Sequence, residues 1–266
     1  MANNILEGKR GIIFGALDEK SIATAVAEAC VAEGGKIILT NAPVALRFGQ
    51  IQKLGEKLNV EVIAADATNL EDLENLISQS MEILGGKLDF ILHSIGMSLN
   101  VRKKRPYTDV NYDWMHKTFD ISSMSFHRLM QTLMKLDAMN EGGSILALTY
   151  IASQRVFPDY SEMAESKALL ESFARSFGYH FGILKKVRVN TISQSPTDTT
   201  AGSGVKGFDK FLSYANKMSP LGNATARECG EYCVIMFSDY TKMVTMQNLY
   251  HDGGFSKMGM NPAVLE

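Results

Sequence analysis

The sequence lacks the features that mark membrane, secreted and nucleic-acid-binding proteins. Nowhere do about eighteen uncharged apolar residues follow one another, and the start, MANNILEGKRG, holds no apolar run of the length that a signal peptide needs. We therefore expect no membrane insertion and a cytoplasmic location. With 27 Lys and Arg against 29 Asp and Glu, the formal net charge is −2. The concentrated positive field that binds a phosphate backbone is missing, so nucleic acid is not an expected partner.

Cysteine is also scarce, and the number of cysteines is odd. Cys30, Cys229 and Cys233 are the only three in a chain of 266 residues, which is long enough to bury a sizeable core without disulfides. Cys229 and Cys233 lie four apart in the apolar stretch ECGEYCVIMF, and no further ligands are found to complete a metal site with them. We expect reduced thiols on the core face of a helix, and no metal.

Short apolar runs alternate with longer amphipathic ones along most of the chain. The short runs predict strands at 10–14, 36–40, 60–65, 88–94, 143–150, 187–193 and 246–251. Between them, helices are predicted at 21–35, near 46–58, near 70–84, from about 111 to 138 and from about 160 to 183, with two more after residue 207. Strands that are apolar throughout are typical of a parallel sheet with helices on both faces. The pattern predicts a single doubly wound α/β domain over residues 1–266.

The turn after the first predicted strand, GALDEKSIA (15–23), allows two interpretations. Gly15 would let the backbone approach a pyrophosphate, and Ser21 precedes a helix N-terminus that attracts negative charge. However, only one glycine of the G-x-G-x-x-G fingerprint is present, so a tight turn with a serine cap fits equally well. Asp66, after the third predicted strand, also allows two interpretations, since its carboxylate could bind an adenine amino group or cap a turn. The end of the second strand, TNAPVAL, carries no charged residue that would select a cofactor.

The fourth predicted strand ends in HSIG (93–96), at the edge where open α/β sheets bind ligands. A hydrolase is one possibility for a serine at such a strand end. Its nucleophile elbow would need glycine two residues before Ser94, where this chain has Leu92. No motif pairs any of the five histidines with a nucleophile, which argues against a Ser-His-Asp enzyme.

The stretch TYIASQRVFPDYSEMAESK (149–167) carries Tyr150, Tyr160 and Lys167. Seven residues span nearly two helical turns, so Tyr160 and Lys167 are predicted to share one face of a helix. A lysine ammonium beside a phenol favours the phenolate through its charge and hydrogen bonding, which gives such a pair a chemical use. A core aromatic and a solvated lysine are the alternative.

Taken together, the motifs resemble the enoyl-[acyl-carrier-protein] reductase family, a divergent branch of the short-chain dehydrogenases/reductases. They are GALDEKSIA, HSIG, DISSMSF (120–126), LTYIASQRVFPDYSEMAESK (148–167), VRVNTISQSP (187–196) and YHDGGFS (250–256). The resemblance covers residues 5 to 257, and its most specific part is Tyr-x6-Lys, where ordinary short-chain reductases have Tyr-x3-Lys. It implies a Rossmann-type fold and reduction of a trans-2-enoyl thioester by NADH rather than NADPH. It also implies acyl-carrier protein as partner and a homotetramer.

The resemblance also implies roles for individual residues. Tyr160 would stabilise or protonate the enolate oxygen, Lys167 would hold the nicotinamide ribose, and Tyr150 would position or gate the thioester. Cofactor contacts would come from Gly15, Ser21, Ile22, Ala42, Asp66, Ala67, Ser94, Ile95, Gly96, Lys167, Thr197, Asp198, Thr199, Thr200 and Ala201. Substrate contacts would come from Met97, Ser98, Tyr150, Tyr160, Met163 and Phe208.

Two segments depart from the family pattern, in which S-Q-S-P-T-D-T would read closer to S-A-G-P-I-R-T. Asp198 replaces an arginine, and 164–166 replaces a more apolar trio, which leaves cofactor affinity open. The stretch from about 194 to 218 is interpreted as a substrate lid, with a long surface loop as the alternative. Two basic groups, Lys206 with Lys210 and the run 102–105, could dock an acidic carrier protein, although the run could be a solvated charge cluster.

Two other functions remain open at this point. A short-chain carbonyl or 3-oxoacyl reductase should show Tyr-x3-Lys, but position 164 is alanine. A non-catalytic dinucleotide-sensing protein predicts the loss of a catalytic residue, and none is lost.

Overall fold

A computed structural model describes residues 3–47, 49–200 and 202–265. Within these ranges one seven-stranded sheet, parallel throughout, has the order β3-β2-β1-β4-β5-β6-β7. Its strands are β1 (Arg10–Phe14), β2 (Lys36–Asn41), β3 (Val62–Ala64), β4 (Leu88–His93), β5 (Met139–Thr149), β6 (Arg188–Gln194) and β7 (Asn248–His251). The order reverses between β1 and β4, the position at which open α/β sheets bind ligands at the carboxyl ends of their strands. The predicted doubly wound, Rossmann-type fold is confirmed.

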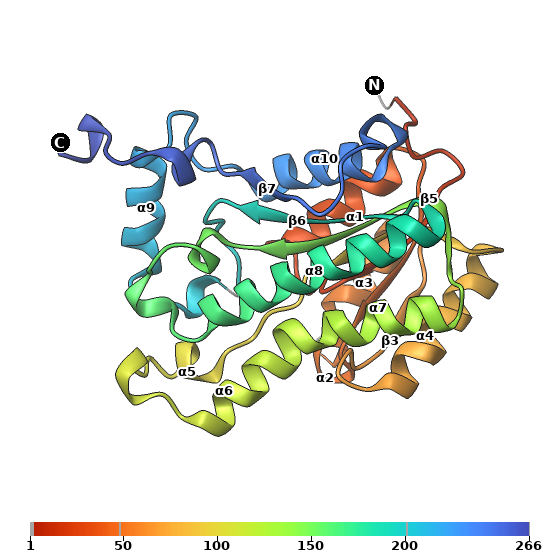
Figure 1. The fold of residues 1–266 in the computed structure, drawn as a ribbon, viewed down its shortest axis with the longest axis horizontal. Helices are drawn as coiled ribbons and strands as arrows, with labels where there is room; N and C mark the ends of the chain where they lie inside the picture. Colours follow the sequence, from red (N-terminus) through yellow and green to blue (C-terminus); the bar gives the residue numbers. More distant parts are fainter. Residues whose placement is uncertain (1–2, 48, 201, 266) are drawn as a thin grey trace.

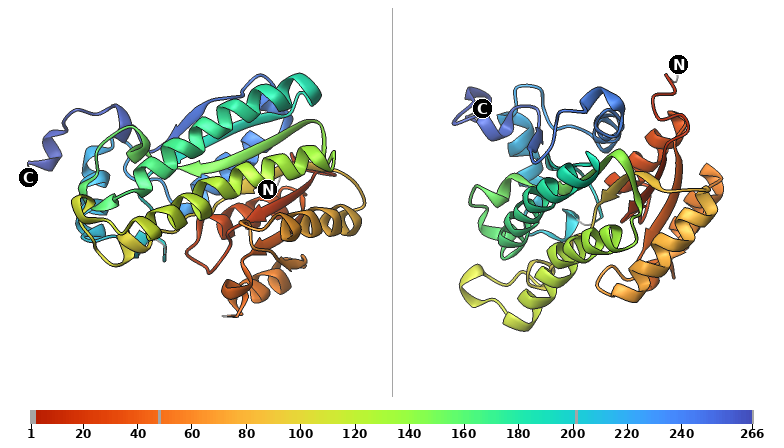
Figure 2. Two further views of the ribbon diagram at one scale, coloured as in Figure 1. Left: turned by 60° about the horizontal axis from the view of Figure 1, so that its bottom comes forward. Right: turned by 45° about the vertical axis from the view of Figure 1, so that its right-hand side comes forward.

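Helices cover both faces of the sheet (Figures 1 and 2). One face packs against α4 (Leu70–Leu84), α7 (Ser125–Lys135) and α8 (Met163–Lys185), and the other against α1 (Ile22–Ala32), α3 (Gln50–Leu58) and α10 (Ala226–Phe237). Successive residues of β4 serve opposite cores: Phe90 stacks on Phe237 with ring centroids 4.7 Å apart, whereas Ile91 faces the α4–α7–α8 layer. Burial on both faces explains why the strands are apolar throughout.

Three helices lie beyond the sheet, at the end where the strand arrows point (Figure 1). They are α5 (Leu99–Arg102), α6 (Tyr112–Phe119) and α9 (Phe208–Met218), and each follows a strand of the central sheet or its connection. The end of the sheet at the carboxyl ends of β4, β5 and β6 therefore faces segments from two distant parts of the chain, 99–119 and 208–218.

Some predicted boundaries were wrong. The helix predicted from about 111 to 138 consists of α6 and α7 joined by a π-helical turn, Asp120–Met124, and it ends at Lys135. The helix predicted near 46–58 is divided into α2 (Pro43–Leu46) and α3, with Gly49 at a φ of 71° between them. The strand predicted at 143–150 begins earlier, at Met139.

The thiols follow the prediction. All three cysteines are free and fully buried, and Cys229 and Cys233 lie on the core side of α10. In the part of the chain that the structure describes, no group of three or more His, Cys, Asp or Glu side chains could hold a metal ion. No helix there combines the length and apolar character needed to span a bilayer.

Candidate functional site

The site lies at the carboxyl ends of β1 and β4, where two predicted segments touch. Gly15 has a φ of 94°, and a Cβ atom there would lie 2.0 Å from the carbonyl oxygen of Ser94. Only glycine fits this close approach, which brings the turn after β1 against the end of β4. Gly96, two residues further on, is exposed and lies beside α8, because a Cβ atom there would be 3.7 Å from Lys167 Nζ and 4.0 Å from Met163 Cε.

Tyr160 does not lie on the helix that carries Lys167, so the predicted shared helix face was wrong. Tyr160 ends a 3-10 turn, Pro158–Tyr160, and α8 begins only at Met163. Between them Ser161 has a φ of 46° and a ψ of −145°, which turns the chain before the helix starts. The turn places the Tyr160 ring next to that of Tyr150, with centroids 5.3 Å apart and planes inclined by 59°.

Lys167 is buried with its charge inside the site. The side chain is only 8% exposed, and Nζ donates a 2.8 Å hydrogen bond to the carbonyl oxygen of Leu148, two residues before Tyr150. Burial lowers the pKa of Lys167 to about 8, against an opposing effect of the Glu171 carboxylate. At neutral pH the amine is therefore still charged, but it is held at a cost in desolvation.

Both tyrosines keep their protons near neutral pH. Burial raises the pKa of Tyr160 above its usual value, and burial followed by the neighbouring Tyr160 and Asp252 raises that of Tyr150. The sequence had suggested that Lys167 would favour the phenolate of Tyr160. That expectation was wrong, because the lysine is bonded to a backbone carbonyl while desolvation disfavours the phenolate. The phenols are thus hydrogen-bond donors, and the Tyr150 hydroxyl is buried without a partner among the described residues.

A layer of polar residues beneath the site was not foreseen. His93, at the end of β4, is fully buried, with Nε2 2.9 Å from Ser125 Oγ. Burial, and then the charge of Lys167, lowers the pKa of His93 to about 3, so the imidazole is neutral. The π-helical turn aims Ser122 at the backbone of Met97 and Ser123 at Ser166. The motif DISSMSF marked this segment, but only the π-turn geometry shows where each hydroxyl points.

Glu171 is a second feature that sequence reasoning missed. It lies one helical turn beyond Lys167 and is 5% exposed. Its Oε1 accepts hydrogen bonds from Thr149 Oγ1 at 2.7 Å and Ser153 Oγ at 2.6 Å. The carboxylate thereby ties the segments on both sides of Tyr150 to α8. Its spacing of four residues from Lys167 was the available signal.

The remaining predicted cofactor residues lie along the same edge of the sheet. Ser21 caps α1 and accepts from Thr24 N at 3.2 Å, and Ile22 begins that helix. Ala42 precedes α2 after the end of β2.

Asp66 Oδ1 accepts hydrogen bonds from the backbone N–H and the hydroxyl of Thr68. These bonds agree with the interpretation of Asp66 as a turn cap, although they use only one of its two carboxylate oxygens. Ala67 and Ile95 pack against the core between α4 and α7. Their contacts with a cofactor stay a prediction.

The segment after β6 is tied to the turn after β1. Asp198 pairs with Lys20 at 3.2 Å, and the Thr200 hydroxyl donates to Asp18. Thr197 and Thr199 form hydrogen bonds within their own segment, and Ala201 lies outside the described residues.

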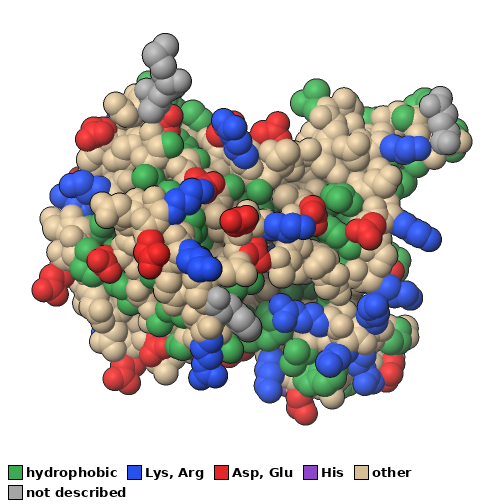
Figure 3. Space-filling view, turned by 180° about the vertical axis from the view of Figure 1, so that it is seen from behind, with side chains coloured by type: hydrophobic (Ala, Val, Ile, Leu, Met, Phe, Trp, Pro, Cys, Tyr) green, Lys and Arg blue, Asp and Glu red, His purple; other side chains and the backbone are tan. Residues whose placement is uncertain are grey.

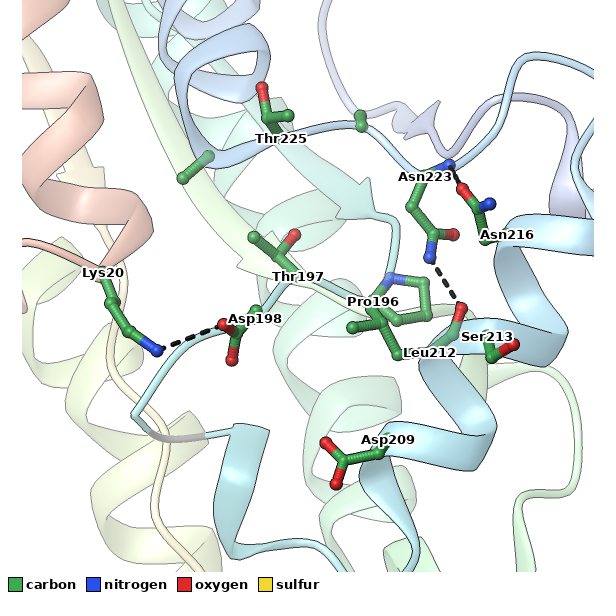
Figure 4. A pocket seen from close by; sticks show the side chains of 12 residues that line it. Lys20, Pro196, Thr197, Asp198, Asp209, Leu212, Ser213, Asn216, Asn223 and Thr225 are labelled. Carbon is green, nitrogen blue, oxygen red and sulfur yellow. Dashed lines mark hydrogen bonds and ion pairs between the residues drawn. The ribbon is translucent and has the colours of Figure 1, made fainter.

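Beside the Lys20–Asp198 pair, a pocket of about 540 Å³ opens between this segment, α9 and the start of α10 (Figure 4). Asp198 thus has a partner of opposite charge, which the family arginine at that position would not have.

The predicted substrate side contains more aromatic rings than expected. An aromatic cluster has neighbouring ring centroids 5.2 to 6.4 Å apart and consists of Tyr150, Phe157, Tyr160, Phe211, Tyr214 and Phe255. Phe208, the predicted contact on α9, packs against Gly202, whereas Phe211, one turn later, reaches the Tyr150 ring. Ser98 is buried and donates to Glu162, while Met97 and Met163 lie near Gly96.

Comparison with known proteins gives a consistent assignment. The family model described as enoyl-(acyl carrier protein) reductase matches residues 15–256. The chain is 33% identical over 260 residues to enoyl-[acyl-carrier-protein] reductase [NADH] 2 of Rhizobium meliloti, covering 97% of this chain and 95% of that protein.

Solved structures extend the likeness to the fold. The FabI–NADH complex of Alistipes finegoldii is 59% identical, with a TM-score of 0.97 over 98% of this chain and 92% of that one. The Bacillus cereus enoyl-acyl carrier protein reductase with NADP+ and an indole naphthyridinone is 29% identical, with a TM-score of 0.90 over 98% and 100% of the two chains.

Proposed function

The chain belongs to the enoyl-(acyl carrier protein) reductase family, and we propose that it reduces trans-2-enoyl thioesters to saturated acyl thioesters with NADH during fatty acid elongation. The observation that carries this proposal is the arrangement at the end of the sheet: the Tyr150 and Tyr160 rings lie together, and the Lys167 ammonium lies between the end of β5, where it is bonded to Leu148, and Gly96.

The protonation states suit this reaction. Negative charge develops on the thioester carbonyl oxygen as a hydride is added to the β-carbon, and a preorganised donor lowers that barrier. Tyr160 is a protonated phenol held in a turn, so its hydroxyl would donate to this oxygen and then supply or relay the proton. The Lys167 ammonium would bind the ribose hydroxyls of the nucleotide and keep the local field positive. Tyr150, whose hydroxyl is buried without a partner among the described residues, would position the thioester.

The chain's residues fit a nicotinamide dinucleotide, which supplies the hydride when bound. Gly15, whose backbone lies against Ser94, precedes the N-terminus of α1, an eleven-residue helix whose free N–H groups would bind a pyrophosphate. Ser21 and Ile22, with Gly15, would meet the pyrophosphate and ribose region, and the strand-end residues 94–96 would line the central part of the cofactor. Asp66 and Ala67 would contact the adenine, and residues 197–201 the nicotinamide and phosphates. NADH is favoured over NADPH because Ala42 carries no charge and the relative bound to NADH is 59% identical, against 29% for the relative bound to NADP+.

The lid from about 194 to 218 would close over the acyl chain within a single domain spanning residues 1–266. Phe211 and Tyr214 of α9 already join the aromatic cluster around Tyr150. A closed lid would exclude water from the hydride path. This arrangement supports a cover for the substrate rather than an ordinary surface loop.

The carrier protein would dock on a basic surface consisting of Arg102, Lys103, Lys104, Lys206 and Lys210, all exposed. The two basic groups adjoin, because a Cβ atom at Gly204 would lie 3.6 Å from Arg102 Cγ. Lys and Arg side chains gather over this end of the molecule (Figure 3). Such a field would steer an acidic carrier to the lid. A homotetramer and a cytoplasmic location complete the proposal and rest on the family resemblance.

The test follows NADH oxidation with a crotonyl or longer enoyl thioester, beside a 3-oxoacyl thioester. Turnover of the enoyl substrate alone is expected, and turnover of the 3-oxoacyl substrate alone would favour a carbonyl reductase. Folded protein that binds NADH but reduces neither substrate would point to a sensing protein. Lys167→Ala should chiefly weaken NADH binding, and Tyr160→Phe should chiefly slow reduction. If both variants kept the wild-type rates, the assignment of these residues would be wrong.

A further inference from the structure

The turn between Tyr160 and α8 contains a fully buried carboxylate. Glu162 has no exposed surface, and its Oε1 accepts hydrogen bonds from Ser98 Oγ at 2.7 Å and Thr118 Oγ1 at 2.6 Å. Burial raises the pKa of Glu162, but hydrogen bonds, the strongest from Thr118, outweigh it and hold the pKa below its usual value. The group is therefore an anion at neutral pH, and its described hydrogen-bond donors are hydroxyls rather than a cation.

The two hydroxyls come from two different segments that follow β4. Ser98 lies two residues after Gly96 and caps α5 by accepting from Val101 N at 3.0 Å. Thr118 lies near the end of α6, just before the π-helical turn that holds Met97 through Ser122. Through one oxygen atom, Glu162 joins the strand-end loop and α6 to the turn that carries Tyr160.

That turn needs such support because of its backbone. Ser161, between Tyr160 and Glu162, has a φ of 46° and a ψ of −145°, a conformation that residues other than glycine rarely adopt. Residues held in such conformations persist only where the surroundings fix them. Tyr160 itself lies outside the helix, so the hydrogen-bond ladder of α8 does not hold it.

We infer that Glu162 is a positioning residue for reduction: by binding Ser98 and Thr118, it holds the 160–162 turn so that the Tyr160 hydroxyl points at the substrate carbonyl. The inference rests on the proposed function. It adds a role for a residue that touches neither the tyrosine hydroxyl nor the reacting atoms.

The test compares kcat and KM for an enoyl thioester in Glu162→Ala, Glu162→Gln, Ser98→Ala and Thr118→Val. Misplacing a reacting group costs up to about 100-fold in rate. We expect Glu162→Ala to lower kcat by roughly 10- to 100-fold, with the Kd for NADH within about twofold of wild type. Glu162→Gln keeps an acceptor oxygen and should recover most of the rate. Thr118→Val and Ser98→Ala should each lower kcat, and Glu162→Ala/Thr118→Val should be no slower than Glu162→Ala alone.

Glu165→Gln, three residues further on in the first turn of α8, is the matched control. Glu165 is exposed and accepts from the Tyr107 hydroxyl at 2.8 Å, so its change should leave both constants at wild-type values. The inference is overturned if the variants keep the wild-type kcat, or if the rate per NADH-binding site is unchanged and only the folded fraction falls. If Glu162→Ala does not fold, Thr118→Val and Ser98→Ala decide the matter in the same assay. Wild-type protein without enoyl turnover would instead refute the proposed function itself.

Discussion

Replacing Lys167 with methionine should change how the stability of the protein depends on pH. Methionine matches the unbranched lysine side chain as far as Cε, lacks the amine and cannot carry a proton. In the folded chain, burial lowers the pKa of Lys167 from 10.5 to about 8, whereas the unfolded chain keeps the ordinary value. Between these two values the unfolded state binds more protons, so this lysine makes the free energy of unfolding of the wild type rise with pH.

The magnitude follows from that difference in pKa. Below pH 8 the buried charge costs roughly 3 to 4 kcal/mol, from a pKa difference of about 2.5 at about 1.4 kcal/mol for each unit. At pH 10 the folded-state lysine is almost wholly neutral, and under 1 kcal/mol of the cost remains. Relative to Lys167→Met, the wild type should therefore gain roughly 2 to 3 kcal/mol between pH 7 and pH 10.

Urea unfolding of the cofactor-free wild type and variant at pH 7, 8, 9 and 10 measures this change. The quantity to follow is the difference in the free energy of unfolding between wild type and variant at each pH. The variant lacks the hydrogen bond to Leu148 at every pH, and all other groups titrate in both proteins. Neither effect therefore changes how this difference varies with pH. Lys210→Met, at an exposed position on α9, is the control and should show a difference that does not vary with pH. A pH-independent difference for Lys167→Met would refute the reasoning, because it would mean that the amine is hydrated or paired in the folded protein.

Three further predictions concern NADH binding and the KM for the enoyl substrate. Binding of NADH, measured by fluorescence titration, should weaken above pH 8 as Lys167 loses its proton, and the weakening should be absent in Lys167→Met; a flat profile in the wild type would contradict the assigned role. Asp198→Ala breaks an ion pair whose two side chains are each more than half exposed, so the NADH affinity should change by less than about 1 kcal/mol and the change should vanish in high salt. A larger, salt-independent loss would mean that Asp198 contacts the cofactor directly. Phe211→Ala removes the ring that joins α9 to Tyr150, so KM should rise several-fold for a long enoyl chain and little for crotonyl; equal effects on both substrates would argue against a lid over the acyl chain.

The sequence predicted the strands and their covering helices because burial on both faces of a parallel sheet leaves continuous apolar runs. It failed where the backbone departs from regular geometry for reasons that no pattern records. Hydrophobic residues through 111–138 were interpreted as one helix, and no residue type in that stretch marks the π-helical turn at Asp120–Met124. A serine does not indicate a positive φ, so the sequence predicted that the helix begins at about residue 160, where the structure has a turn.

The roles of the predicted site residues stay predictions, and the geometry around them agrees with the sequence only in part. Tyr150 and Tyr160 lie side by side, and Lys167 is bonded to the strand two residues before Tyr150. Burial raises the pKa of Tyr160, against the effect that the lysine was expected to have, and burial is a tertiary property that spacing does not record. The replacement of a family arginine by Asp198 became interpretable only when the fold placed Lys20 opposite it, 178 positions away in the sequence. No rule of sequence spacing predicts that two residues so far apart will pair.

The gap of six residues between Tyr160 and Lys167 has a structural consequence that the Tyr-x3-Lys spacing of ordinary short-chain reductases would not have. Four positions along one helix would fix a tyrosine and a lysine relative to each other through the hydrogen-bond ladder alone. Seven positions leave Tyr160 in a separate turn, where it is free to face Tyr150 but has lost that ladder as support. The chain then needs other contacts to hold the phenol, and it provides them through Glu162 to Ser98 and Thr118 and through Glu171 on the far side of Tyr150. In this chain the longer spacing and the two buried carboxylates therefore belong to one arrangement.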